Sequence, residues 1–138
     1  MRIMLDTNVL VSALVFGGTV RKVLDVIIKL DWDIYVSEYV DAEFKRILNE
    51  KWSDKAEKIY LLYRQMDFIF CKSTHEILGT LRDKKDIPVL SDALFYGVDI
   101  LLTGDKDFLD SDIKIPLIIS PTEFWEFIRK KFFEVNLI

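Results

Sequence analysis

The sequence predicts an α/β protein: a single three-layer α/β/α domain over residues 1–138 with a mainly parallel five-stranded sheet. Short apolar runs alternate with segments of helical periodicity, which is the pattern of βαβ units around a parallel sheet. The runs are apolar at successive positions, as expected of strands that helices cover on both faces. At 138 residues, of which 51% are hydrophobic, the chain is long enough to bury one substantial core.

The N-terminal half begins with an apolar run at residues 3–5, which predicts the first strand. Gly17 and Gly18 break the chain, and Thr19 is a suitable N-cap for a helix over residues 20–28, where apolar positions recur at helical spacing. The elements predicted next are a strand at 33–36, helices at 38–49 and 54–66, and a strand at 68–72. Ser53 is expected to cap the helix at 54–66.

A polar connection through Gly79 and the charged run at 82–86 opens the C-terminal half. The next helix, expected over residues 87–96, tolerates Pro88 in its first turn and ends near Gly97. The remaining predicted elements are strands at 99–102 and 115–119 and a closing helix at 122–131. In such sheets ligands bind beyond the carboxyl ends of the strands.

Composition limits the classes of function. The net charge of −4 provides no overall basic surface, so binding to nucleic acid would need a metal ion, a local basic patch or a basic partner. The single cysteine, Cys71, excludes an internal disulfide framework and is expected to be a buried thiol in a reducing compartment. No run approaches the ~20 apolar residues that cross a bilayer, so we expect a cytoplasmic protein without a membrane segment.

Four acidic residues are candidates for one site. Asp6 follows the first strand, and Asp105 follows the strand at 99–102 in the turn that begins at Thr103. Glu43 lies within the apolar stripe of its helix, where a glutamate is costly unless it is paired, metal-bound or at the border of the stripe. Asp86 precedes a helix, and an N-cap role alone would also explain it.

Other polar residues are secondary candidates. Asn8 could orient Asp6 or contact a phosphate, and Asp107 shares the turn of Asp105 and is a supporting or replacement acid. Asp92 lies about 240° around its helix from Asp86 and off the apolar stripe, which predicts a solvated or rim position. The single histidine, His75, is not needed by the chemistry proposed below.

Four converging carboxylates repel one another, and the pKa of at least one would rise. A hard divalent cation removes this conflict, and Mg²⁺ and Mn²⁺ both prefer oxygen ligands. The pattern therefore indicates a metal-dependent phosphoryl-transfer site. A phospho-receiver domain is disfavoured because Phe70, Cys71 and Lys72 stand where its acceptor aspartate would follow strand three. An aspartyl phosphatase is disfavoured because residue 8 is asparagine.

These motifs resemble those of PIN-domain ribonucleases, the family that includes VapC-type toxins. The resemblance covers essentially the whole chain. Its motifs are Met4-Leu5-Asp6-Thr7-Asn8-Val9, the segment from Ser37 through Glu43 to Leu48, Asp86 to Ala93, Val98 to Phe108 and Ile118 to Phe124. Many relatives carry adjacent aspartates where this chain has Lys85 and Asp86, which leaves open whether Asp86 alone, or Asp83 or Asp92 with it, completes the site.

The resemblance implies that Asp6, Glu43, Asp86 and Asp105 form a catalytic, metal-binding quartet, supported by Asn8 and Thr103. It also implies cleavage of single-stranded RNA to products with 5′-phosphate and 3′-hydroxyl ends, a basic antitoxin partner and a homodimer. The alternatives are a PIN-fold module that binds RNA or protein with little or no catalysis, and a housekeeping RNA-processing nuclease. The candidates for RNA-backbone contacts are Lys45, Arg46, Arg82, Lys84, Lys85 and Lys106.

Overall fold

A five-stranded, entirely parallel sheet forms the centre of the molecule in the computed structural model, which describes residues 1–134 and the side chains of residues 1–131. Its strands are β1 (Arg2–Leu5), β2 (Asp33–Ser37), β3 (Ile69–Cys71), β4 (Ile100–Leu102) and β5 (Leu117–Ile119). They lie in the order β3-β2-β1-β4-β5. The chain therefore first builds the sheet outward from β1 to β3 and then returns to add β4 on the other side of β1.

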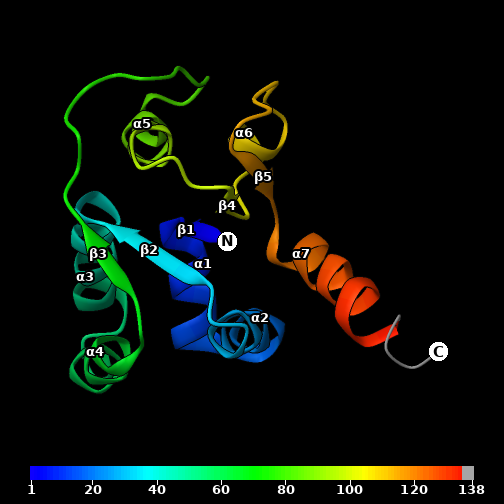
Figure 1. Ribbon diagram of the computed structural model, residues 1–138. Coiled ribbons are helices and arrows are strands. Elements are labelled where there is room, and N and C mark those ends of the chain that lie inside the picture. The colour runs from blue at the N-terminus through cyan, green and yellow to red at the C-terminus, as the bar shows by residue number, and fades with distance from the viewer. Residues whose placement is uncertain (135–138) are drawn as a thin grey trace.

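Helices cover both faces of this sheet (Figure 1). They are α1 (Thr7–Val11), α2 (Gly18–Lys29), α3 (Glu38–Lys51), α4 (Ala56–Gln65), α5 (Ile87–Phe95), α6 (Lys106–Leu109) and α7 (Pro121–Ile128). The helices α5 and α6 lie on one face, and α1 to α4 lie with α7 on the other (Figure 1). This is the predicted three-layer α/β/α fold.

The two central strands hold the core together. Ile3, Met4 and Leu5 of β1 are completely buried, and β4 pairs with them in register, with Leu5 opposite Leu102. Strands covered on both faces have no solvent-facing side, which is why their sequences are apolar at successive positions. The register places the carboxyl ends of β1 and β4 side by side at the point where the strand order reverses, the usual ligand-binding position in such sheets.

The structure confirms each predicted strand and helix, with bounds that differ by a few residues. Two predicted caps are wrong. Gly17, with φ of +79°, is the N-cap of α2, so Thr19 lies inside that helix, and Lys55 rather than Ser53 precedes α4. The prediction also missed α1 and the π-helical turn at Ser12–Phe16, because the polar residues after β1 resemble a turn.

Three further observations each concern a single prediction. Cys71 is half-buried, and burial together with the negative charge of Asp92 raises the pKa of its thiol to about 11. Among the residues described, no helix combines the length and apolar character needed to cross a bilayer. The predicted closing helix corresponds to α7 followed by a π-helical segment, Arg129–Glu134.

Candidate metal centre

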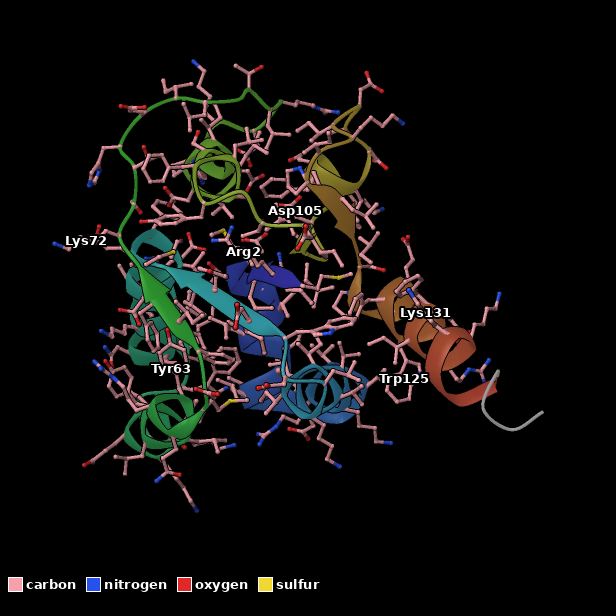
Figure 2. The ribbon with its side chains drawn as sticks, viewed as in Figure 1. Arg2, Tyr63, Lys72, Asp105, Trp125 and Lys131 are labelled. Carbon is pink, nitrogen blue, oxygen red and sulfur yellow. The ribbon has the colours of Figure 1, made fainter. Side chains whose placement is uncertain are left out.

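Three of the four predicted acids meet at the carboxyl ends of β1 and β4. Asp6 directly follows β1, Asp105 is the N-cap of α6 just beyond β4, and Asp86 is the N-cap of α5. One carboxylate oxygen from each lies within 4.8 Å of the others. Glu43, from α3, lines the same pocket, which has a volume of about 310 Å³. Figure 2 shows Asp105 close to β4.

Asp6 is the most firmly held of these carboxylates. It is 5% exposed, and its two oxygens accept hydrogen bonds from the Thr7 backbone N–H (2.8 Å), the Asn8 side-chain amide (3.0 Å) and the Thr103 hydroxyl (2.8 Å). Burial raises the pKa of Asp6, while the bonds from Thr103 and Thr7 oppose that rise. The nearby charges of Asp105 and Glu43 raise the pKa further.

Asn8 and Thr103 form hydrogen bonds that connect the carboxyl ends of β1 and β4. The side-chain oxygen of Asn8 accepts the backbone N–H of Gly104 at 2.9 Å. The Thr103 hydroxyl, which donates to Asp6, also accepts the backbone N–H of Asp105 at 3.0 Å. Through these hydrogen bonds both side chains orient acidic residues.

Asp86 differs from Asp6 because its charge is poorly compensated. Although it occupies the N-cap position of α5, its backbone is already helical, and within the described residues its side chain makes no capping hydrogen bond. Its Oδ2 atom is buried and has no hydrogen-bond partner among the described residues. Burial, followed by the charges of Asp105 and Asp6, raises the pKa of Asp86 from 3.8 to about 7. Helix capping, the simple alternative reading, therefore does not account for this aspartate.

Asp105 and Asp107 occupy the first turn of α6. The Oδ1 atom of Asp105 accepts the backbone N–H of Asp107 at 2.9 Å, so Asp105 caps the helix and still faces Asp6 and Asp86. Asp107 belongs to a neighbouring group, in which its carboxylate and those of Asp83 and Asp86 also lie within 4.8 Å of one another.

The structure places Asp92 and His75 outside the acidic pocket. The prediction of a solvated or rim position for Asp92 is wrong, because the side chain is only 1% exposed. The segment that follows β3 covers this side of α5, and the Thr74 backbone N–H donates to Asp92 at 2.7 Å. His75 is 81% exposed and lies 3.9 Å from Glu38.

One basic residue at the acidic pocket was missed by the sequence analysis. Lys51 lines the pocket with Ile47 and Trp52, whereas none of the six predicted basic residues is among its described lining residues. Ile47 and Lys51 follow Glu43 at spacings of four and eight on α3, so the helical period could have identified this side of the helix.

The donor set fits a hard divalent cation. Three carboxylates with oxygens close enough to share one ion are the ligands that Mg²⁺ and Mn²⁺ prefer, and the buried Asp86 Oδ2 is free to act as one. Burial and then repulsion from Asp105 and Asp6 raise the pKa of Asp86, and a bound cation would relieve both by compensating the charge. The arrangement can therefore hold a divalent metal ion at the carboxyl ends of β1 and β4.

Comparison with known proteins agrees with this geometry. A family model described as the PIN domain matches residues 2–107. Among solved structures, a chain in the structure of VapBC2 from Rickettsia felis has a similar fold, with a TM-score of 0.68. That structure contains VapBC2 bound to a DNA fragment from the VapBC2 promoter. The sequences are 17% identical, and the match covers 87% of this chain and 98% of that one. No curated protein matches the chain.

Proposed function

The chain belongs to the PIN domain family, and from this premise we propose that it is a divalent-metal-dependent endoribonuclease that cleaves single-stranded RNA. We further propose that Asp6, Glu43, Asp86 and Asp105 are its catalytic residues and the ligands of Mg²⁺ or Mn²⁺. The observation that carries this proposal is the close approach of three carboxylates, one of which keeps a buried oxygen without a partner among the described residues.

The chain's own residues divide the work of the site. Thr7, Asn8 and Thr103 hold Asp6 in one orientation, so a first ligand is positioned before a cation binds. Asp86 contributes a carboxylate that nothing else in the described structure neutralises. A divalent ion, when bound, supplies charge neutralisation of the scissile phosphate and lowers the pKa of the attacking water.

The substrate's phosphate backbone needs positive charge near this acidic pocket. Lys51 is the basic residue that lines it, and its side chain is long enough to reach a phosphate beside the carboxylates. The six predicted basic residues would contact RNA farther from the cleaved bond. Asp107 is proposed as a supporting acid through its group with Asp83 and Asp86.

We also propose that residues 1–138 work as one nuclease domain, as the cytoplasmic toxin of a toxin–antitoxin pair. Two observations support a basic protein partner. The net charge is −4, and the similar structure from Rickettsia felis is a VapBC2 complex. A homodimer is the proposed assembly. A gene for a short DNA-binding protein directly upstream would support the toxin role, whereas its absence would favour an RNA-processing nuclease.

The direct test is cleavage of end-labelled single-stranded RNA by the purified full chain with Mg²⁺ or Mn²⁺. The wild type should cleave it and leave 5′-phosphate and 3′-hydroxyl ends, and chelator should abolish cleavage. Asp6→Asn keeps the shape of the side chain and removes its charge, so it should reduce the rate to background. Asp54→Asn, at an exposed position that is not among the residues lining the pocket, is the matched control and should retain full activity.

Equal cleavage by wild type and Asp6→Asn, or cleavage that survives chelator, would refute the nuclease assignment. RNA that binds with metal-dependent affinity but stays intact would instead support the binding-module alternative. If the chain cleaves RNA but no gene for a short DNA-binding protein lies upstream of its own, the nuclease proposal stands and only the toxin role is removed.

A further inference from the structure

A second pocket, separate from the metal centre, lies where the chain passes from β3 to α5. The segment leaves β3 at Lys72 and rises toward α5 (Figures 1 and 2). Together with the first turns of α3 and α5, residues 73–77 enclose a cavity of about 420 Å³. This volume is within the range of small-molecule sites. The cavity and the acidic pocket share none of the residues described as lining either one.

Asp92 is the buried charge of this cavity. Its side chain is 1% exposed, and its Oδ1 atom accepts the Thr74 backbone N–H at 2.7 Å. The Oδ2 atom of Asp92 and the hydroxyl of Thr74 are both buried and have no hydrogen-bond partner among the described residues. No salt bridge of the described structure involves Asp92. A buried carboxylate oxygen without a donor is costly, so this position favours a ligand that donates hydrogen bonds and carries positive charge.

The apolar walls of the cavity fit the apolar part of such a ligand. Its walls are largely apolar, with Ala42, Ile77, Ile87 and Pro88 among the lining residues. Glu38 and Glu76 add two more carboxylates to the lining. An anion would be repelled, and a hydrophobic neutral molecule would leave the Asp92 oxygen without a partner. A water molecule could bridge the two free polar atoms but would leave the apolar walls uncovered.

We propose that this cavity binds a small organic cation, a guanidinium or primary ammonium group on a short apolar stem. The cationic group pairs with the Asp92 Oδ2 atom, the Thr74 hydroxyl gives it a second polar contact, and the stem lies against Ile87 and Pro88. This inference is independent of the proposed nuclease activity, because it uses none of the metal-centre residues.

The test uses the full chain and a matched pair of probes, butylguanidinium and its uncharged analogue butylurea. The Thr74 backbone N–H donates to Asp92, so its amide resonance reports on the cavity, and the Gly104 amide, which donates to Asn8, reports on the acidic pocket. Butylguanidinium should shift the Thr74 resonance in a saturable way with little change at Gly104. Butylurea should bind at least tenfold more weakly.

Two variants examine the contacts separately. Asp92→Asn keeps an oxygen for the Thr74 N–H and removes the charge, so it should weaken butylguanidinium binding at least tenfold. Ala42→Phe, at an exposed position of α3, should obstruct the cavity without changing a buried side chain. Asp54→Asn should bind like the wild type.

Several results would overturn the inference. These are shifts confined to Gly104, equal binding of the two probes, or unchanged affinity in both cavity variants. A short peptide with one central arginine is the last probe. If it saturates the Thr74 shift while butylguanidinium does not bind, the cavity serves a protein side chain and the small-molecule assignment is wrong.

Discussion

Replacing Asp86 by asparagine should stabilise the metal-free protein, even though we propose that this residue is essential for activity. Burial and the charges of Asp105 and Asp6 raise the pKa of Asp86 to about 7, which means that the folded protein resists ionising it. Asparagine has nearly the same shape and no charge, and its amide can donate to a neighbouring carboxylate. The variant therefore removes repulsion without opening a cavity.

The size of the effect follows from the shift in pKa. A rise from 3.8 to about 7 corresponds to an upper bound of about 4 kcal/mol. Solvent reaches the pocket and screens the repulsion, so a gain of about 1–2 kcal/mol in the free energy of unfolding is expected. The folded-state pKa lies above the unfolded one, so the folded protein holds the extra proton between these pH values. Its stability therefore falls as pH rises through that window.

Urea unfolding of both proteins in chelator checks this reasoning. The advantage of Asp86→Asn should be greatest above pH 7 and shrink as the pH falls toward 4. Adding Mg²⁺ should stabilise the wild type and leave the variant unchanged, because a ligand that binds only the folded state raises stability. Asp54→Asn should shift stability by less than about 0.5 kcal/mol at every pH. A variant less stable than the wild type at pH 8 in chelator would show that the repulsion at Asp86 has been misjudged.

Substitutions at three further positions have defined outcomes. Thr103→Val removes the buried hydroxyl that donates to Asp6, so it should lower the free energy of unfolding by about 1–3 kcal/mol. Thr103→Ser keeps the hydroxyl and should lower it by less than about 1 kcal/mol. Thermal unfolding measures both variants. Tyr63→Phe removes a 2.7 Å hydrogen bond to Asp41 and should cost about 1 kcal/mol in urea unfolding with RNA cleavage unchanged; a slower cleavage rate would mean that α4 contributes to the site. Glu43→Gln should weaken Mg²⁺ binding about tenfold by calorimetry, and an unchanged affinity would remove it from the ligand set.

The sequence predicted the sheet well because strands that are buried on both faces are apolar at successive positions. Residues 3–5 and 100–102 are apolar at every position, and the structure buries all of them between two layers of helices. The positions of Asp6 and Asp105 at strand ends then follow from chain order alone. Local patterns gave less reliable caps: Thr19 and Ser53 are good capping residue types, but Gly17 and Lys55 occupy those positions.

The prediction for Asp92 failed because it depended on a contact between segments that are distant in the sequence. A helical wheel treats the side opposite the apolar stripe as solvent, so it placed Asp92 in water. In the structure the segment after β3 crosses that side of α5, and Thr74, eighteen residues earlier, donates to Asp92. For Asp86 the position in the sequence indicated a helix cap. The structure shows that its side chain makes no capping hydrogen bond among the described residues.

The metal centre combines one carboxylate whose oxygens accept hydrogen bonds with another carboxylate that has a buried oxygen without a donor among the described residues. Three donors fix Asp6, whereas Asp86 keeps a buried oxygen free and a raised pKa beside Asp6 and Asp105. If all the carboxylates were satisfied by protein donors, a cation would gain little by displacing them. If none were, the pocket would have no fixed geometry. The hydrogen bonds to Asp6 thus fix the geometry of the pocket, and the uncompensated charge of Asp86 favours binding of a cation. The measurable consequence is the lower free energy of unfolding that ionised Asp86 causes in the metal-free protein.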